Sequence, residues 1–155
     1  MMRFLPRPSK IFVFDLLERE LSAYHGEIGL DAGSARFKNR PLFRTKTYYG
    51  LDYDHSALKN GIREYQEDTW GIFVDLCNIE SLPSNSVDVV VSTNTLYHLP
   101  QEHINNAITE LSRVTRPGGV FILELPIDEE YDSRIALLAP FFASTRIVYY
   151  RSIIS

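Results

Sequence analysis

Cysteine is nearly absent from this sequence, since Cys77 is the only one among 155 residues. A single cysteine cannot form an internal disulfide, and it excludes a zinc site built from several thiolates. No other metal cluster is visible in the sequence either, and we predict no metal centre. The lack of a possible disulfide is consistent with a reducing compartment, and we expect a cytoplasmic protein.

Long hydrophobic runs are missing as well. Pro6, Pro8 and Asp15 interrupt the apolar stretch near the N-terminus. A helix that spans a bilayer needs about 20 predominantly apolar residues in a row. The sequence therefore predicts no membrane partner.

The chain also lacks an excess of positive charge. It has 16 Lys and Arg residues against 20 Asp and Glu residues, which gives a formal net charge of -4. A nucleic-acid partner gains no electrostatic support from this balance. We find no basic run or stripe that argues for one, so we expect no nucleic-acid partner, although RNA binding at a single site stays open as an alternative.

What is present suffices for one packed domain. Hydrophobic residues make up 45% of the chain, and the length fits a single core. We expect one domain over residues 1–155, with an N-terminal helix in 1–25, a central core in 26–125 and a short C-terminal part in 126–155.

Apolar runs typical of strands alternate with patterns typical of helices. Helices are predicted at 9–24, after Asp54 as N-cap with Gly61 as the stop, from Pro100 onward, and at 134–142. Strands are predicted at 27–31, 47–52, 70–75, 87–92 and 120–125, with a further one at 146–150, and residues 32–46 are expected to form a loop. This alternation predicts an α/β fold with a mostly parallel central sheet and helices on both faces.

Three of the predicted strands end in an acid, namely Asp31, Asp52 and Asp75. In such sheets ligands bind outside the carboxyl ends of the strands. The hydroxyls of a ribose and the amine of an adenine both need acceptors. The loop after Asp31 allows a close backbone approach. We expect Asp88, in contrast, to have a structural role and to bind the backbone near the first strand.

Six segments, taken in order, resemble the class I S-adenosylmethionine-dependent methyltransferases, in a domain of the methyltransferase type 11 kind. The resemblance covers most of the chain, from about Gly26 to Leu125. The segments are the glycine-rich motif 30–35, Tyr-Gly-Leu-Asp at 49–52, Val-Asp-Leu at 74–76, the run 82–90, Leu-Tyr-His-Leu at 96–99, and the helix and turn 111–119.

The resemblance implies a Rossmann-like fold with strand order 3-2-1-4-5-7-6 and a core at 26–125 that binds the cofactor. The cofactor would be S-adenosyl-L-methionine, with S-adenosyl-L-homocysteine as product. The acceptor is expected to be a small molecule, with protein and RNA acceptors left open. The implied cofactor-binding residues are Asp31, Ala32, Gly33, Asp52, Tyr53, Asp75, Leu76 and Thr93. The candidates for catalysis are His98 and Tyr97.

Two positions depart from the family pattern. Ala35 stands where the second glycine of the first motif is expected, and Phe37 where the third is expected. A side chain there adds atoms where the backbone should approach the cofactor. A methyltransferase-like binding module without catalysis therefore remains an alternative. A nicotinamide-dependent oxidoreductase is disfavoured, because no dinucleotide glycine pattern is present.

The C-terminal part is short for this family, which usually ends in a two-stranded hairpin. An unpaired apolar edge is seldom left bare, and Phe141, Phe142, Tyr149 and Tyr150 add apolar surface. We therefore expect either self-association through the C-terminal third or cover by further polypeptide. Irregular coil that shields the edge is the third possibility.

Overall fold

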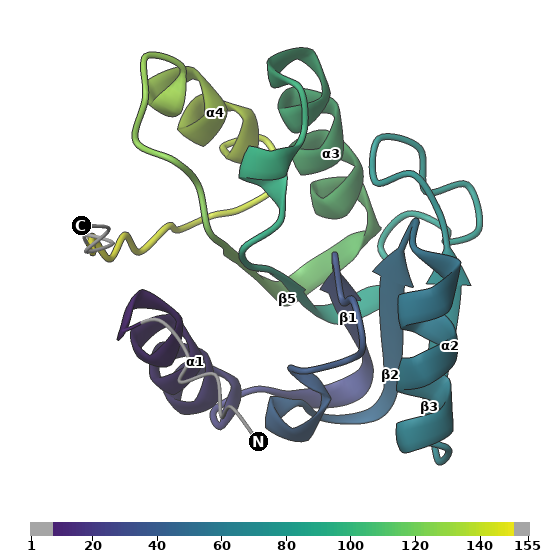
Figure 1. The fold of residues 1–155 in the computed structure, drawn as a ribbon. Helices are drawn as coiled ribbons and strands as arrows, with labels where there is room; N and C mark the ends of the chain where they lie inside the picture. Colours follow the sequence, from purple (N-terminus) through teal and green to yellow (C-terminus); the bar gives the residue numbers. More distant parts are fainter. Residues whose placement is uncertain (1–7, 151–155) are drawn as a thin grey trace.

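The computed structural model describes residues 8–150, and its centre is a five-stranded, fully parallel sheet with the order β3-β2-β1-β4-β5 (Figure 1). The strands are β1 (His25–Ala32), β2 (Arg44–Asp52), β3 (Thr69–Phe73), β4 (Val87–Ser92) and β5 (Thr115–Leu123). The helices are α1 (Pro8–Leu21), α2 (His55–Glu64), α3 (Gln101–Val114) and α4 (Tyr131–Leu138), with 3-10 turns η1 (Arg40–Leu42) and η2 (Leu96–His98). The predicted α/β class is confirmed, and the strand order agrees with the first five positions that the family implies.

Each face of the sheet has its own hydrophobic core. Leu30 and Val90 face α3, whose stripe of Ile104, Ile108 and Leu111 is fully buried. On the opposite face, residues of β2 and β4 meet α1, η1 and α2. Because strand side chains alternate between faces, the central strands are buried on both sides, as a parallel sheet requires.

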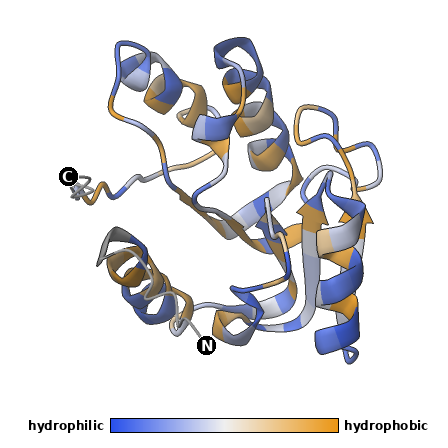
Figure 2. Ribbon diagram, viewed as in Figure 1, coloured by the Kyte–Doolittle hydropathy of each residue, from blue (hydrophilic) through white to orange (hydrophobic). Residues whose placement is uncertain are grey.

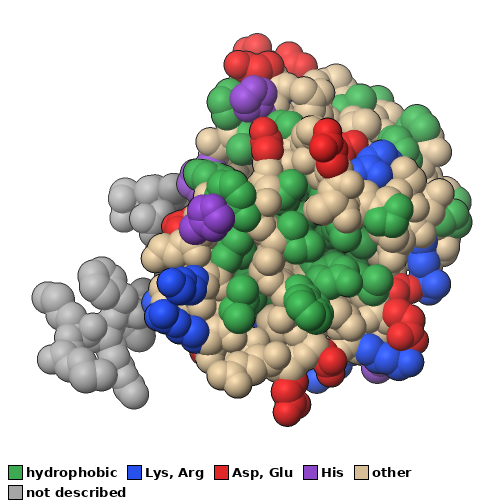
Figure 3. Space-filling view, turned by 90° about the vertical axis from the view of Figure 1, so that its right-hand side faces the viewer, with side chains coloured by type: hydrophobic (Ala, Val, Ile, Leu, Met, Phe, Trp, Pro, Cys, Tyr) green, Lys and Arg blue, Asp and Glu red, His purple; other side chains and the backbone are tan. Residues whose placement is uncertain are grey.

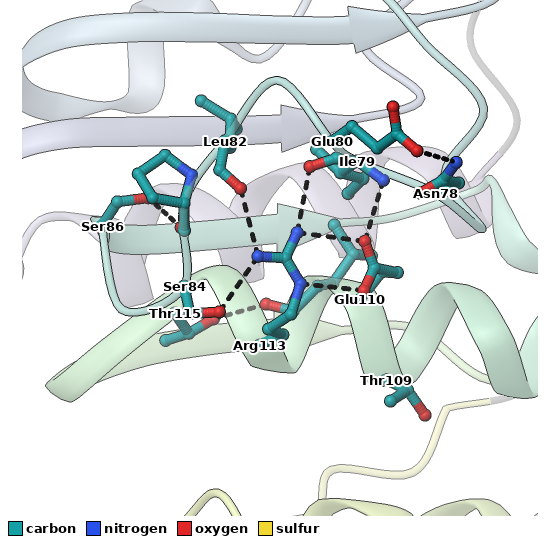
Figure 4. Close-up of polar contacts among 12 residues, drawn as sticks. Asn78, Ile79, Glu80, Leu82, Ser84, Ser86, Thr109, Glu110, Arg113 and Thr115 are labelled. Atoms are coloured by element: carbon teal, nitrogen blue, oxygen red, sulfur yellow. Dashed lines mark hydrogen bonds and ion pairs between the residues drawn. The ribbon is translucent and has the colours of Figure 1, made fainter.

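On the α3 face, residues 74–86 connect β3 to β4 without a helix. Arg113 of α3 holds this segment, because its guanidinium donates to the carbonyl oxygens of Ile79 at 3.0 Å and Leu82 at 3.1 Å (Figure 4). Glu110 pairs with Arg113 at 2.8 Å and accepts from the Ile79 amide at 2.8 Å. The Arg113 guanidinium lowers the pKa of Glu110, which keeps this carboxylate charged and the pair intact.

On the other face, β1 and β2 are joined by residues 33–43, which contain only the turn η1. Parallel strands usually need a crossover of a dozen or more residues that includes a helix. Here the ring of Phe37 replaces that helix. It is fully buried and meets Tyr48 of β2 edge-on, with 5.3 Å between ring centroids. Phe37 adopts a φ of 61°, which turns its side chain inward at the cost of backbone strain.

Three glycines make room for this ring. A Cβ on Gly50 would lie 2.2 Å from the Phe37 ring, one on Gly61 would lie 2.6 Å from it, and one on Gly71 would lie 3.3 Å from it. The prediction that Gly61 stops the helix after Asp54 is wrong, because α2 continues to Glu64. Gly61 is needed for packing rather than for helix termination. The N-cap prediction is confirmed, since the Asp54 side chain accepts from the Ala57 amide at 3.0 Å.

The two edges of the sheet differ in what they expose. At the β3 edge, hydrophobic side chains gather on the surface in Figure 3, and Trp70 and Phe73 are 62% and 54% exposed. At the β5 edge, the predicted strand at 146–150 is wrong, because residues 139–150 form neither helix nor strand. The predicted helix at 134–142 is α4, which lies earlier and is shorter. Within residues 8–150, β5 therefore pairs with β4 alone.

The Phe37 packing predicts an unusual coupling. Phe37→Ala is expected to destabilise the fold by about 3–5 kcal/mol, because it leaves a cavity. Gly61→Ala is expected to destabilise as well, although glycine to alanine within a helix normally stabilises by up to about 1 kcal/mol. In the double variant the methyl group added at position 61 enters the cavity left by Phe37→Ala, so the free-energy cost of Gly61→Ala falls. Urea unfolding of the four proteins measures this coupling, and additive costs would contradict it.

The unpaired β5 edge predicts self-association. Val120 to Leu123 carry none of the charges or prolines that protect natural edges, and Ile147, Val148 and Tyr149 nearby are exposed. Light scattering at increasing concentration is expected to show a dimer, and Ile122→Lys on β5 is expected to shift it to monomer. A wild-type chain that stays monomeric at all concentrations rejects this prediction.

Candidate functional site

The carboxyl ends of the strands bring two of the predicted acids together. Asp52 pairs in register with Phe73, and its carbonyl accepts from the Val74 amide at 3.1 Å. Asp75 follows directly, so both carboxylates lie at the tips of the neighbouring strands β2 and β3. This is the edge of the sheet where ligands of α/β proteins bind.

Asp52 organises the loop around it. Its Oδ2 accepts from the Ala35 amide at 2.8 Å, and its Oδ1 accepts from the Asp54 amide at 3.0 Å. The side chain is only half-buried. A carboxylate can accept about four hydrogen bonds, so Asp52 retains capacity for two hydroxyl donors.

Asp75 is exposed, and its Oδ1 accepts from the Cys77 amide at 2.9 Å. Burial and the neighbouring Asp75 raise the pKa of the Cys77 thiol to about 11, so Cys77 is neutral at physiological pH and is a weak nucleophile. Tyr53 is 76% exposed beside this edge, whereas Leu76 is buried in the core. Leu76 can therefore offer a ligand its backbone more readily than its side chain.

In the glycine loop, residues 33–35, the backbone amides already donate hydrogen bonds within the chain. The amides of Gly33 and Ser34 both donate to the Leu51 carbonyl, at 2.8 and 3.0 Å. Gly33 has a φ of +73°, and a Cβ there would lie 2.2 Å from Thr95. Glycine is thus required at this position for the close approach of Thr95, whose hydroxyl also donates to the Ala32 carbonyl at 3.2 Å.

Asp31, the third predicted acid, does not reach this edge. Only 1% of it is exposed, and its carboxylate accepts from the Tyr48 hydroxyl at 2.7 Å and from the Asn39 amide at 3.3 Å. Burial raises the pKa of Asp31 to about 6, against the opposing effect of these hydrogen bonds. Its side chain therefore anchors the loop from within.

A groove of about 1410 Å³ lies beside the tips of β4 and β5. Thr93, Tyr97 and His98 line it at this end. α1 forms one wall, with hydrophobic residues that appear orange in Figure 2. The groove thus combines an apolar lining with polar groups at its mouth, as small-molecule and cofactor sites do.

Asn94 and Glu124 stand at the same mouth, and the sequence did not single out Asn94. The Glu124 carboxylate accepts a short hydrogen bond from the Asn94 amide, and Asn94 has a φ of 55°. The left-handed backbone is tolerated by asparagine better than by most residues. The available sequence signal was an asparagine two residues after a buried strand.

The polar and aromatic side chains at the tips of β2 and β3 fit a nucleoside cofactor with a positive charge. Asp52 and Asp75 supply carboxylate acceptors for hydroxyl and amine groups, and Tyr53 supplies an exposed aromatic ring. The fit is poorer at the glycine loop, whose amides are already bonded. Within residues 8–150 no cluster of acidic, histidine or cysteine side chains could hold a metal ion. No helix in this range is long and apolar enough to cross a membrane.

The buried Asp31 predicts a pH-dependent stability. Its pKa of about 6 in the folded chain lies above the ordinary value of 3.8 for an aspartate. The stabilising contribution of the protonated form is thus complete below about pH 4 and is lost as the pH rises through 6. We expect wild type to lose about 2–3 kcal/mol of unfolding free energy between pH 4 and 7 relative to Asp31→Asn.

Urea unfolding of both proteins across this pH range tests the assignment. Tyr48→Phe is the control, because it removes a hydrogen bond that lowers the pKa of Asp31. That variant should move the loss of stability to higher pH. Parallel pH profiles of wild type and Asp31→Asn would show that another group is responsible.

Solved structures of other proteins share this fold. The N-methyltransferase NodS from Bradyrhizobium japonicum, crystallised with S-adenosyl-L-homocysteine, superimposes with a TM-score of 0.69 at 18% identity, over 86% of this chain and 75% of that one. The YcgJ protein from Bacillus subtilis gives a TM-score of 0.65 at 17% identity, over 83% and 58% of the two chains. At these identities the likeness establishes the fold.

Sequence relatives point the same way. The tRNA N(3)-cytidine methyltransferase METTL2 of Gallus gallus is 32% identical over 108 residues, which are 63% of this chain and 28% of that protein. METTL2 of Bos taurus is 29% identical over the same shares. The chain thus matches little more than a quarter of the length of these relatives.

The family model described as "Methyltransferase domain" matches residues 27–123, from β1 to the end of β5. Because that match covers more than half of the chain, this protein belongs to the methyltransferase domain family, whose fold is that of the class I S-adenosylmethionine-dependent methyltransferases.

Proposed function

We propose that this protein transfers a methyl group from S-adenosyl-L-methionine to an acceptor. The observation that carries the proposal is the pair of carboxylates, Asp52 and Asp75, at the tips of the neighbouring strands β2 and β3. Asp52 would accept the ribose hydroxyls, and Asp75 would accept from the adenine amine. Tyr53 and the backbone at Leu76 would border the nucleoside.

The remaining predicted contacts come from the ends of β1 and β4, and Thr93 also lines the groove. The backbone at Ala32 and Gly33 and the side chain of Thr93 would border the methionine part of the cofactor. S-adenosyl-L-methionine supplies an activated methyl group, so the chain needs to orient and desolvate the partners rather than to generate a strong electrophile. In the transfer, a lone pair of the acceptor would form the new bond to the methyl carbon as the carbon–sulfur bond breaks, with S-adenosyl-L-homocysteine as the leaving group.

His98 and Tyr97 would contact the acceptor at the mouth of the groove. Their rings lie 4.3 Å apart, and both side chains are exposed. A general base is needed only when the acceptor carries a proton on its nucleophilic atom. We therefore propose them as acceptor contacts and keep a base role for His98 as the narrower possibility.

The sequence relatives favour a different class of acceptor from the small molecule that we expected from the sequence. The two METTL2 proteins are named for a cytidine in tRNA. The groove has ample volume for a nucleotide, and aromatic rings such as those at its mouth stack on bases. We propose an RNA acceptor for this chain.

A binding module without catalysis is the second candidate, and one observation favours it. The amides of Gly33, Ser34 and Ala35 are all bonded to Leu51 or Asp52. In this state none of the three can donate to a ligand. Such a module would hold the cofactor at Asp52 and Asp75 without turning it over.

The cofactor site predicts different effects for two neighbouring acids. Asp52→Asn is expected to weaken binding of S-adenosyl-L-homocysteine by about 1.5–3 kcal/mol, because a charged acceptor is lost. Asp54→Ala removes the cap of α2 and is expected to lower stability by about 1 kcal/mol, with little effect on affinity. Titration calorimetry and thermal unfolding separate the two quantities.

A nicotinamide dinucleotide serves as the negative control in the same titration. Absence of any heat with S-adenosyl-L-homocysteine would end the proposal that this chain is an active enzyme. Swapped effects of the two variants would show that Asp54 rather than Asp52 meets the cofactor. Cofactor binding without transfer to any RNA would favour the binding module.

A further inference from the structure

The positive charge of this chain is concentrated in one segment. Between Asp31 and Asp52 there is no acidic residue, yet five of the 16 Lys and Arg residues lie there. The remaining eleven share the rest of the chain with all 20 acidic residues. The even overall balance therefore hides a local excess, which the search for a basic run or stripe in the sequence overlooked. We call these five residues the basic stripe: Arg36, Lys38, Arg40, Arg44 and Lys46.

The missing helix between β1 and β2 gives the stripe its place. Because Phe37 is buried under the loop, its neighbours Arg36 and Lys38 are turned outward and are exposed. In Figure 1 the connection lies between α1 and α2. Arg44 pairs in register with His25 at the start of β1, whereas Arg36 follows its end. The stripe therefore extends about 25 Å along the sheet, at about 3.3 Å per strand residue.

Three of the five cations are available to a partner. Arg40 donates to the Thr69 hydroxyl at 2.9 Å, and Lys46 pairs with Glu27 at 2.6 Å. Arg36, Lys38 and Arg44 make no side-chain hydrogen bond or ion pair within residues 8–150. The attraction of Lys38 for the buried Asp31 helps to oppose the rise in its pKa but does not occupy the ammonium donors.

The stripe leads into the groove. Lys38 and Asn39 line the same groove as Thr93, Tyr97 and His98. A polyanion that lies on the stripe would thus reach the mouth beside the proposed methyl donor. Phosphate contacts fix the register of a nucleic acid, while its bases stack on aromatic rings in an adjoining site.

We propose that the basic stripe binds the phosphate backbone of an RNA substrate and directs one of its nucleotides into the groove. This inference rests on the proposed function only for the delivered nucleotide. The contact with phosphates depends on the charges alone. Arg36 and Lys38 meet the phosphates next to the groove, and Arg44 meets phosphates farther along the strand.

The test measures binding of the full chain to an unmodified tRNA transcript by fluorescence anisotropy at several salt concentrations. The triple variant Arg36→Gln, Lys38→Gln, Arg44→Gln is compared with Arg19→Gln, Lys59→Gln, Arg63→Gln. The control removes the same charge from the exposed surfaces of α1 and α2. We expect the stripe variant to bind about tenfold or more weakly at low salt. Its salt dependence should lose about three units of logarithmic slope, and the control should change little.

Several outcomes overturn the proposal. The first is wild type that does not bind the transcript at low salt, and the second is a control variant that loses as much affinity as the stripe variant. The third is stripe-dependent binding to phosphatidylserine vesicles without binding to RNA, which would assign the stripe to a membrane surface. Thermal unfolding checks that both variants remain folded.

Binding of S-adenosyl-L-homocysteine to the same preparations keeps the two proposals apart. If the ligand binds and the transcript does not, the stripe proposal fails while the cofactor proposal stands. If the transcript binds through the stripe and the ligand does not, the cofactor proposal fails instead.

Discussion

The packing of one aromatic ring determines much of this structure. Phe37 fills a space bounded by Gly50, Gly61 and Gly71, which belong to β2, α2 and β3. A side chain at Gly50 or Gly61 would collide with the ring, so the three elements and the loop must close on it together. Because cores are packed at the density of organic crystals, this arrangement admits few alternatives. The chain thus joins two parallel strands by eleven residues without a helix.

The inward turn of Phe37 has consequences on both sides of the loop. Toward the strand tips, it places the Ala35 amide 2.8 Å from Asp52 and so orients the carboxylate proposed for the ribose. Toward solvent, it leaves Arg36 and Lys38 on the surface. Below it, Tyr48 packs on the ring and donates to Asp31. The departure from the glycine pattern therefore has a structural reason, since Phe37, which stands where the third glycine is expected, fills the core.

The sequence predicted the elements that depend on hydrophobic periodicity. It failed to predict features that depend on packing between elements far apart in the sequence. The five strands and α3 followed from apolar runs and a helical stripe, and Asp88 binds the Glu27 and Ile28 amides as expected. The role of Gly61 could not be predicted, because it depends on a ring 24 positions away in the sequence. The apolar run at 146–150 has strand character, yet β propensity expresses packing on a half-buried surface. Tyr149 is 64% exposed and lacks that surface.

The same limit applies to the candidate site. Asp52 and Asp75 were predictable, because parallel strands that end in acids must place them at one edge. Asp31 was expected there by the same argument, but its side chain points to the other face and is buried. Strand alternation accounts for this, since Leu30 and Ala32 face the α3 core and the residue between them cannot. A strand-end acid thus becomes a ligand contact only when its parity and its depth both allow it.

The fold separates the acidic strand tips from the basic stripe, and this separation of charge relates the fold to the proposed function. The sulfonium cofactor is cationic at sulfur, and the carboxylates of Asp52 and Asp75 stand at the strand tips where it would bind. RNA is polyanionic, and the acid-free segment extends away from those tips along the sheet. Potentials of opposite sign on neighbouring surfaces favour one ligand and repel the other at each place. The overall net charge of such a chain is a poor guide to its partners. Acidic residues elsewhere cancel the positive charges in the total, yet they do not neutralise the potential of the basic stripe where they lie more than about 10 Å from it.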